Sequence, residues 1–167
     1  MTPTNDLAVI AAQEKSLVLT ELNDDVVWAL GSCLRDLARQ RNASVAIDIR
    51  RFGQILFSAS LTGATPDNAE WIRRKSNVVR RLLRSSYAIG LQVKEAETTI
   101  LKKYALADAD YSAHGGAFPL AVANAGIIGS VAVSGLPQRE DHELVVQALC
   151  TLLRRDYSIL ALAKIPA

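Results

Sequence analysis

Aromatic residues, cysteine, methionine and histidine are all scarce in this sequence of 167 residues. Aromatic residues make up only 5%, so the core has to be built mainly from Ala, Val, Leu and Ile. The two cysteines, Cys33 and Cys150, form no Cys-x-x-Cys pair, which excludes a thiol-based zinc site and a dithiol redox motif. Each lies in a segment with helical apolar spacing, which is typical of a buried thiol.

Strong charge of one sign and long hydrophobic runs are lacking too. The formal net charge of +2 is too small to indicate nucleic-acid binding. Nowhere do about 18 apolar residues follow one another, so no segment is expected to span a membrane. The N-terminal stretch has no basic leader, and its longest apolar run, 7–12, is shorter than the core of a signal peptide. We therefore expect a cytoplasmic protein with neither a membrane nor a nucleic acid as partner.

Hydrophobic periodicity predicts a single α+β domain over residues 1–167. Asn23 and Thr65 are expected helix caps, with Pro66 at a first helical position. Two pairs of strands are each joined by a short turn, in which Gly53 or Gly126 can take a positive φ, so each pair should form an antiparallel hairpin. The result is a five-stranded antiparallel sheet covered by helices. Helices are predicted over about 6–14, 24–41, 66–84, 87–104 and 137–155, and strands over 17–22, 44–50, 54–60, 117–123 and 126–134.

The tripeptide His114-Gly115-Gly116 ends a polar loop directly before the strand 117–123. In an antiparallel hairpin the start of the first strand lies opposite the end of the second, so the tripeptide should lie near Ser134 and Gly135. The helix beginning near Pro137 would point its free N–H groups at the same rim. Glycine N–H groups, a hydroxyl and a helix N-terminus suit an anionic group. We therefore expect a ligand site at this end of the sheet.

The two histidines of the sequence, His114 and His142, are expected to converge on that site. His142 borders the buried face of the last helix and lies within reach of the hairpin end. A neutral imidazole there could hydrogen-bond a ligand or coordinate a haem iron. The alternative for each stays open: His114 caps a turn, and His142 bridges Asp141 or a backbone carbonyl.

Residues 65–84 contain the dense positive charge of the sequence. A solvated helix face or salt bridges to a neighbouring subunit are the expected roles of these side chains. Trp71 is interpreted as a core or interface anchor, and the apolar C-terminal tail as packing on another chain or along its own. The basic residues are Arg73, Arg74, Lys75, Arg80, Arg81 and Arg84.

Two segments resemble the GlcG/HbpS-like proteins, a family labelled the haem-degrading domain family. The segment 115–149 has a Gly-Gly turn, a Pro-containing strand, a hairpin, a Val-Ser-Gly strand end and an acidic helix start. The segment 68–90 and the HGG tripeptide are similar to one uncharacterised UPF-type branch. The resemblance covers about 44–153 and implies a profilin-like arrangement and homo-oligomers. It also implies, for some members, binding of haem or a related tetrapyrrole, and its Trp-x-x-x-Lys pattern makes Lys75 a cation for the pocket.

Three functions remain open from the sequence. The first is a module that binds a small anionic or tetrapyrrole ligand, with His114 or His142 as the metal ligand if haem is bound, since Met1 as the sole methionine excludes His/Met ligation. The second is a structural or partner-binding assembly without a small ligand. The third is an enzyme on an unidentified metabolite with His114 as acid or base. Gly-x-Ser-x-Gly, P-loop, dinucleotide and His-x-x-x-His patterns are missing, so no catalytic residue is assigned.

Overall fold

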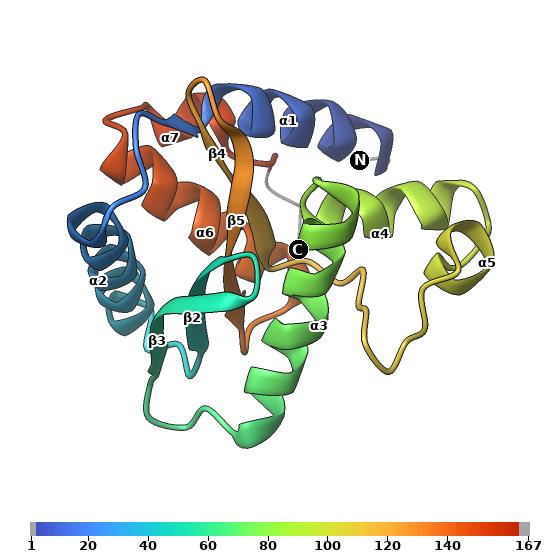
Figure 1. Cartoon of the computed structure of the whole chain (residues 1–167), viewed down its shortest axis with the longest axis horizontal. Coiled ribbons are helices and arrows are strands. Elements are labelled where there is room, and N and C mark those ends of the chain that lie inside the picture. Colours follow the sequence, from blue (N-terminus) through green and yellow to red (C-terminus); the bar gives the residue numbers. More distant parts are fainter. Residues whose placement is uncertain (1–2, 164–167) are drawn as a thin grey trace.

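The computed structural model describes residues 3–163 (Figure 1). The predicted order of helices and strands is confirmed, with one helix divided in two and a short helix added near the C-terminus. The elements are α1 (Pro3–Ser16), β1 (Val18–Leu19), α2 (Asp24–Gln40), β2 (Ala46–Arg51), β3 (Gln54–Ser60), α3 (Pro66–Leu82), α4 (Ser86–Glu95), α5 (Ile100–Tyr104), β4 (Ala117–Val122), β5 (Gly126–Ser134), α6 (Gln138–Leu152) and α7 (Tyr157–Leu160).

The five strands form one sheet in the order β1-β4-β5-β2-β3. Both predicted hairpins, β2–β3 and β4–β5, are antiparallel, and β2 also pairs antiparallel with β5. The expectation of a purely antiparallel sheet was wrong, because β1 runs parallel to β4 with Val18 opposite Ala121. A parallel pair needs a long crossover connection, which the chain from α2 to α5 supplies. Because β1 has only two residues, its sequence has no periodicity that could predict whether it pairs parallel or antiparallel.

The hairpin turns use left-handed backbone at different residues. In the β4–β5 turn Gly126 has φ 76°, as predicted, and Asn124 precedes it with φ 62°. In the β2–β3 turn the positive φ of 49° falls on Phe52, whereas it was expected on Gly53. The β4–β5 turn therefore uses the ability of glycine to take a positive φ. The β2–β3 turn places a non-glycine residue in the left-handed region.

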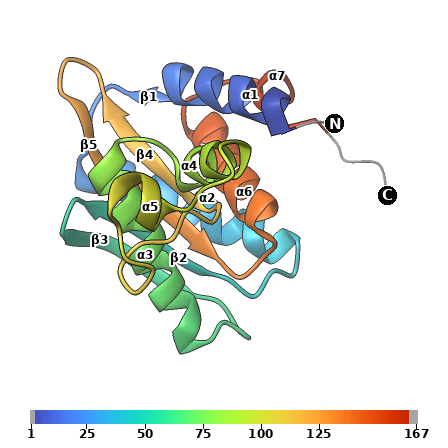
Figure 2. The same ribbon diagram turned by 90° about the vertical axis from the view of Figure 1, so that its right-hand side faces the viewer.

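Helices cover both faces of the sheet. The larger core lies between the sheet and the pair α2 and α6, and it takes Ile47, Ile49 and Val133 from the strands. The opposite face carries small residues, Ala46 and Ala132 among them, and α3 packs on it. Figure 1 shows α2 and α3 on opposite sides of the sheet, and Figure 2 shows α3, α4 and α5 in front of it. Covering on both faces explains why β4 and β5 read as nearly continuous apolar runs.

The helix predicted over 87–104 is two helices. α4 ends at Glu95, Glu97 takes a left-handed φ of 47°, and Thr99 caps α5 by accepting the Lys102 N–H at 3.2 Å. Val93 and Ile100 pack in the same apolar cluster, so the stripe that predicted one helix is shared by two. The cap side chain offers the backbone an alternative to continuing the helix.

Both predicted helix caps are present. Asn23 accepts the Val26 N–H at 2.9 Å at the start of α2, and Thr65 forms a capping box with Asn68 at the start of α3. The described part of the tail, up to residue 163, packs along its own chain, because Leu162 is buried against α1 and α4 residues. Of the cysteines, Cys150 is buried and Cys33 half-buried.

Within residues 3–163, no helix is long and apolar enough to cross a membrane.

Candidate functional site

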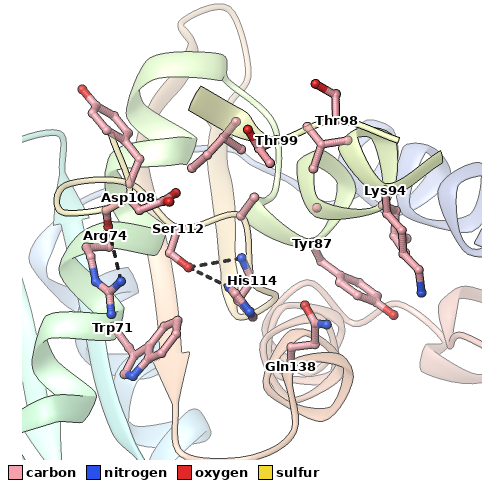
Figure 3. A pocket seen from close by; sticks show the side chains of 16 residues that line it. Trp71, Arg74, Tyr87, Lys94, Thr98, Thr99, Asp108, Ser112, His114 and Gln138 are labelled. Carbon is pink, nitrogen blue, oxygen red and sulfur yellow. Dashed lines mark hydrogen bonds between the residues drawn. The ribbon is translucent and has the colours of Figure 1, made fainter. Parts of the chain in front are cut away.

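The larger of two adjoining cavities has a volume of about 510 Å³ and opens between α3, α4, α5 and the loop 105–116. Figure 3 shows His114, Trp71 and Tyr87 around it. Apolar walls come from α4 and α5, and the charged groups Arg74, Lys94 and Asp108 lie around the rim. The lining residues used below are Trp71, Arg74, Tyr87, Leu91, Lys94 and His114.

A smaller cavity of about 270 Å³ lies beside it at the end of the β4–β5 hairpin. Most of its lining residues have polar or charged side chains, and it shares Trp71, His114 and Gln138 with the larger cavity. The shared residues make the two spaces neighbours across one wall. The remaining lining residues are Asn68, Lys75, Ser134, Gly135, Leu136 and Asp141. Of the seven ligand-binding residues predicted from the sequence, His114, Lys75, Ser134 and Gly135 therefore line one cavity.

His114 is held in the wall by its own loop and by α3. Ser112 donates its N–H to the Arg74 carbonyl at 3.1 Å, and its Oγ lies 3.0 Å from His114 Nδ1 (Figure 3). The imidazole meets the Trp71 ring edge-on at a centroid distance of 5.1 Å. Partial burial, then the positive charges of Lys75 and Arg74, lower the pKa of His114. The ring is therefore neutral at pH 7, and Nε2 makes no hydrogen bond to any residue between 3 and 163.

The glycines around His114 bring backbones together. A Cβ on Gly90 would lie 2.1 Å from the Ala113 carbonyl oxygen, which explains the glycine inside the apolar stripe of α4. A Cβ on Gly115 would lie 2.2 Å from the Gln138 carbonyl oxygen, and the Gly115 N–H already donates to Gln138 Oε1 at 3.1 Å. The expectation that this N–H faces an anion was wrong, because close packing onto α6 uses it inside the chain.

A buried ion pair closes the floor of the smaller cavity. Lys75 Nζ lies 2.9 Å from Asp141 Oδ2 and donates to the Val133 carbonyl at 3.2 Å, with Lys75 only 3% and Asp141 1% exposed. The other carboxylate oxygen accepts the Leu136 N–H at 3.0 Å. Burial lowers the pKa of Lys75 and raises that of Asp141, against their mutual attraction. Gly116 has φ 129° and leaves room for the ammonium, since a Cβ there would lie 2.8 Å from Nζ.

Three of the six basic residues between 73 and 84 form ion pairs within the chain, Lys75 among them. Arg73 contacts Glu70 and Asp110, both at 3.0 Å, and Arg84 pairs with Glu14. Arg74 lies over the Trp71 ring, 4.2 Å from its centroid. Trp71 is half-buried in the wall of both cavities, so it is not a core residue, and its role as an interface anchor stays a prediction.

His142 does not reach either cavity, so the predicted convergence of the two histidines was wrong. It is 0% exposed, and its Nε2 lies 2.8 Å from Gln13 Oε1. Tyr87 lines the larger cavity and packs against the His142 ring at 5.3 Å, which places His142 one layer behind the wall. Burial lowers the pKa of His142 to about 3. Helix spacing could not show that Tyr87 packs between His142 and the larger cavity.

Several lining residues were not foreseen, namely Asn68, Tyr87, Lys94, Ser112 and Gln138. Two of them had a local signal: Ser112 lies two positions before His114, and Gln138 begins the helix after Ser134-Gly135. The others come from α3 and α4, whose approach to the loop is a tertiary feature. Between residues 3 and 163 no group of three or more His, Cys, Asp or Glu side chains is placed to hold a metal ion.

Comparison with known proteins places this geometry in a family. Residues 22–150 match the family model described as "Haem degrading protein HbpS-like". A UPF0303 protein of Paraburkholderia phytofirmans is 59% identical over 96% of this chain and 97% of its own length. The solved structure of Ybr137w superposes with a TM-score of 0.82 at 28% identity, covering 89% of this chain and 87% of that one.

A more distant structure shares the fold. The PduOC:heme complex superposes with a TM-score of 0.67 at 15% identity, covering 78% of this chain and 94% of that one. The resemblance drawn from residues 68–90 and 115–149 is thereby confirmed: the chain belongs to the HbpS-like family, and to its UPF0303 branch.

Proposed function

We propose that the chain binds a planar, largely apolar acid of the haem or tetrapyrrole class in the larger cavity. The observation that carries the proposal is His114, a neutral imidazole that stands in the cavity wall and whose Nε2 makes no hydrogen bond to the described residues. Its Nδ1 contact with Ser112 is the type of second contact that orients a metal-ligating histidine.

The cavity suits such a ligand in size and charge. Its volume of about 510 Å³ lies within the range of about 300–1,000 Å³ that is typical of small-molecule sites. Leu91, Val93 and Ile100 offer apolar contact, while Arg74 and Lys94 stand where acidic substituents would meet them. Haem, when bound, would supply an iron atom, and His114 would be the residue to ligate it. The family description and the structural neighbour solved with heme support this ligand class.

The test is a haemin titration of the purified protein and of the variant His114→Ala, followed by the Soret band. We expect saturation at one haemin per chain in the wild type, and at least about a tenfold weaker affinity together with a changed Soret position in the variant, since its axial ligand is lost. His142→Gln is the matched control, because His142 is buried behind Tyr87. Equal spectra and affinities for His114→Ala and the wild type would contradict the proposal.

We further propose that the chain is a homo-oligomer that pairs through β3. This strand ends the sheet, and its outer hydrogen-bonding groups face no other strand of the described chain. Its seven residues, Gln54–Ser60, carry no charge, so two copies can pair antiparallel about a two-fold axis without repulsion. Ile55 is 55% exposed, and the neighbouring Trp28 on α2 is 69% exposed. Both would be covered by a second copy.

Light scattering after size exclusion tests the β3 contact. We expect a mass that is a multiple of 18.1 kDa for the wild type, and a lower multiple for Ile55→Lys, because a charge in the paired edge is costly. Ile159 is 77% exposed on α7, so Ile159→Lys makes the same change away from β3 and should leave the mass unaltered. A wild-type monomer at micromolar concentration would refute the proposal.

A further inference from the structure

The smaller cavity contains two side-chain amides whose oxygen atoms are already engaged by backbone N–H groups. Gln138 Oε1 accepts the Gly115 N–H at 3.1 Å, and Asn68 Oδ1 accepts the Thr65 N–H at 2.8 Å. Each backbone donor dictates which end of its amide is the oxygen, because the opposite orientation would set two donors against each other. Neither NH₂ group donates to a described residue, and both Asn68 and Gln138 line the smaller cavity.

Other polar groups of the smaller cavity add donors and few acceptors. Lys75 has three ammonium protons, and its contacts with Asp141 and Val133 account for two of them. Asp141 is the carboxylate of the cavity, and each of its oxygens accepts a hydrogen bond, one from Lys75 and one from the Leu136 N–H. Ser134 supplies a hydroxyl at the end of β5. The two amide NH₂ groups and the third ammonium proton of Lys75 are thus donors without a partner among the described residues.

We infer that the smaller cavity binds the carboxylate group of the ligand, with Asn68 and Gln138 as its recognition residues and the third ammonium proton of Lys75 as a further donor. A carboxylate is acceptor-only and matches a set of convergent N–H donors. Because Trp71, His114 and Gln138 belong to both cavities, one amphipathic acid can place its carboxylate in the smaller cavity and its apolar body in the larger. This inference rests on the proposed function and adds to it which end of the ligand lies where.

Two isosteric substitutions isolate the donors. Gln138→Glu and Asn68→Asp keep the oxygen that accepts the backbone N–H and replace only the NH₂ donor with a second acceptor. Each new carboxylate lies in the first turn of its helix, where negative charge is favourable, so both variants should fold. Gln147→Glu makes the same chemical change on α6 outside both cavities and serves as the control.

The probes are 4-phenylbutyrate and its amide, 4-phenylbutyramide, titrated into ¹⁵N-labelled protein and followed by ¹H–¹⁵N NMR. We expect the acid to bind more tightly than the amide and to shift the side-chain NH₂ signals of Asn68 and Gln138, which are assigned by their disappearance in the variants. Either variant should weaken acid binding at least about tenfold and amide binding far less, since hydrogen bonds to charged groups are the strong ones. Gln147→Glu should bind both probes as the wild type does.

Equal affinity for acid and amide, or acid binding that both variants retain, would overturn the inference. The haemin titration separates it from the proposed function. Saturating haemin binding with no preference for the acid probe refutes only the carboxylate site. An acid preference that Gln138→Glu abolishes, without saturating haemin binding, upholds the carboxylate site and refutes only the haem-class ligand.

Discussion

Replacing Lys75 with methionine should lower the free energy of unfolding at pH 7 by about 3–5 kcal/mol, the usual cost of breaking a buried ion pair. Methionine matches the length of the side chain but leaves Asp141, 1% exposed, without its cation. The Val133 carbonyl loses its ammonium donor at the same time. The penalty should shrink at pH 5, because protonation of Asp141, whose pKa burial already raises, removes the unpaired charge.

Urea denaturation followed by circular dichroism measures this effect. The double variant Lys75→Met/Asp141→Asn removes both charges and keeps an oxygen for the Leu136 N–H, so it should recover a large part of the loss. Arg73→Met is the matched control, because the ion pairs of Arg73 with Glu70 and Asp110 are solvent-accessible and should cost less than about 1 kcal/mol. Similar losses in Lys75→Met and Arg73→Met would contradict the assigned role.

Acidification should destabilise the protein through His142, whose pKa is about 3 in the fold against 6.5 when unfolded. Below pH 6.5 His142 binds a proton in the unfolded chain but stays neutral in the fold. Its contribution to the free energy of unfolding is therefore fully present above pH 6.5 and is lost as the pH falls towards 3. Between pH 7 and pH 4 this one group should remove about 3 kcal/mol of the free energy of unfolding. Contacts with Tyr87 and Phe118 keep the ring from water.

The variant His142→Gln tests the acid effect, because glutamine does not titrate and can still donate an N–H to Gln13. The wild type should lose about 3 kcal/mol more than this variant between pH 7 and pH 4, measured as the difference of their urea-unfolding free energies. His114→Gln replaces an exposed histidine and should change the pH slope much less. Parallel pH profiles for wild type and His142→Gln would show that His142 titrates normally in the fold.

The sequence predicted well what neighbouring residues control. Asn23 and Thr65 cap helices because a side-chain oxygen reaches a backbone N–H only a few positions away. The hairpins follow from short turns between apolar runs. The pairing of β4 with β5 brings His114-Gly115-Gly116 beside Ser134 and does not depend on the other elements. The break between α4 and α5 was missed because the apolar stripe continues across it from Val93 to Ile100.

The candidate site could be foreseen only in part. His114, Lys75, Ser134 and Gly135 were predicted as ligand-binding residues and line the smaller cavity. The other three predicted residues have structural roles. Gly115 and Gly116 let the backbone and Lys75 pack closely against them, and His142 lies in the core. Periodicity predicts that a side chain faces inwards. It does not predict whether that side chain meets a cavity or packs against a neighbour such as Tyr87.

The sequence by itself determined the α+β class, the hairpins, the helix caps and the family, because these depend on residues close together in the chain or on motifs that stay recognisable without coordinates. The tertiary structure decided the parallel pairing of β1, the burial of His142 and the two cavities that share Trp71, His114 and Gln138. Cavity walls and buried charges arise where distant segments pack, and local spacing carries no record of that packing.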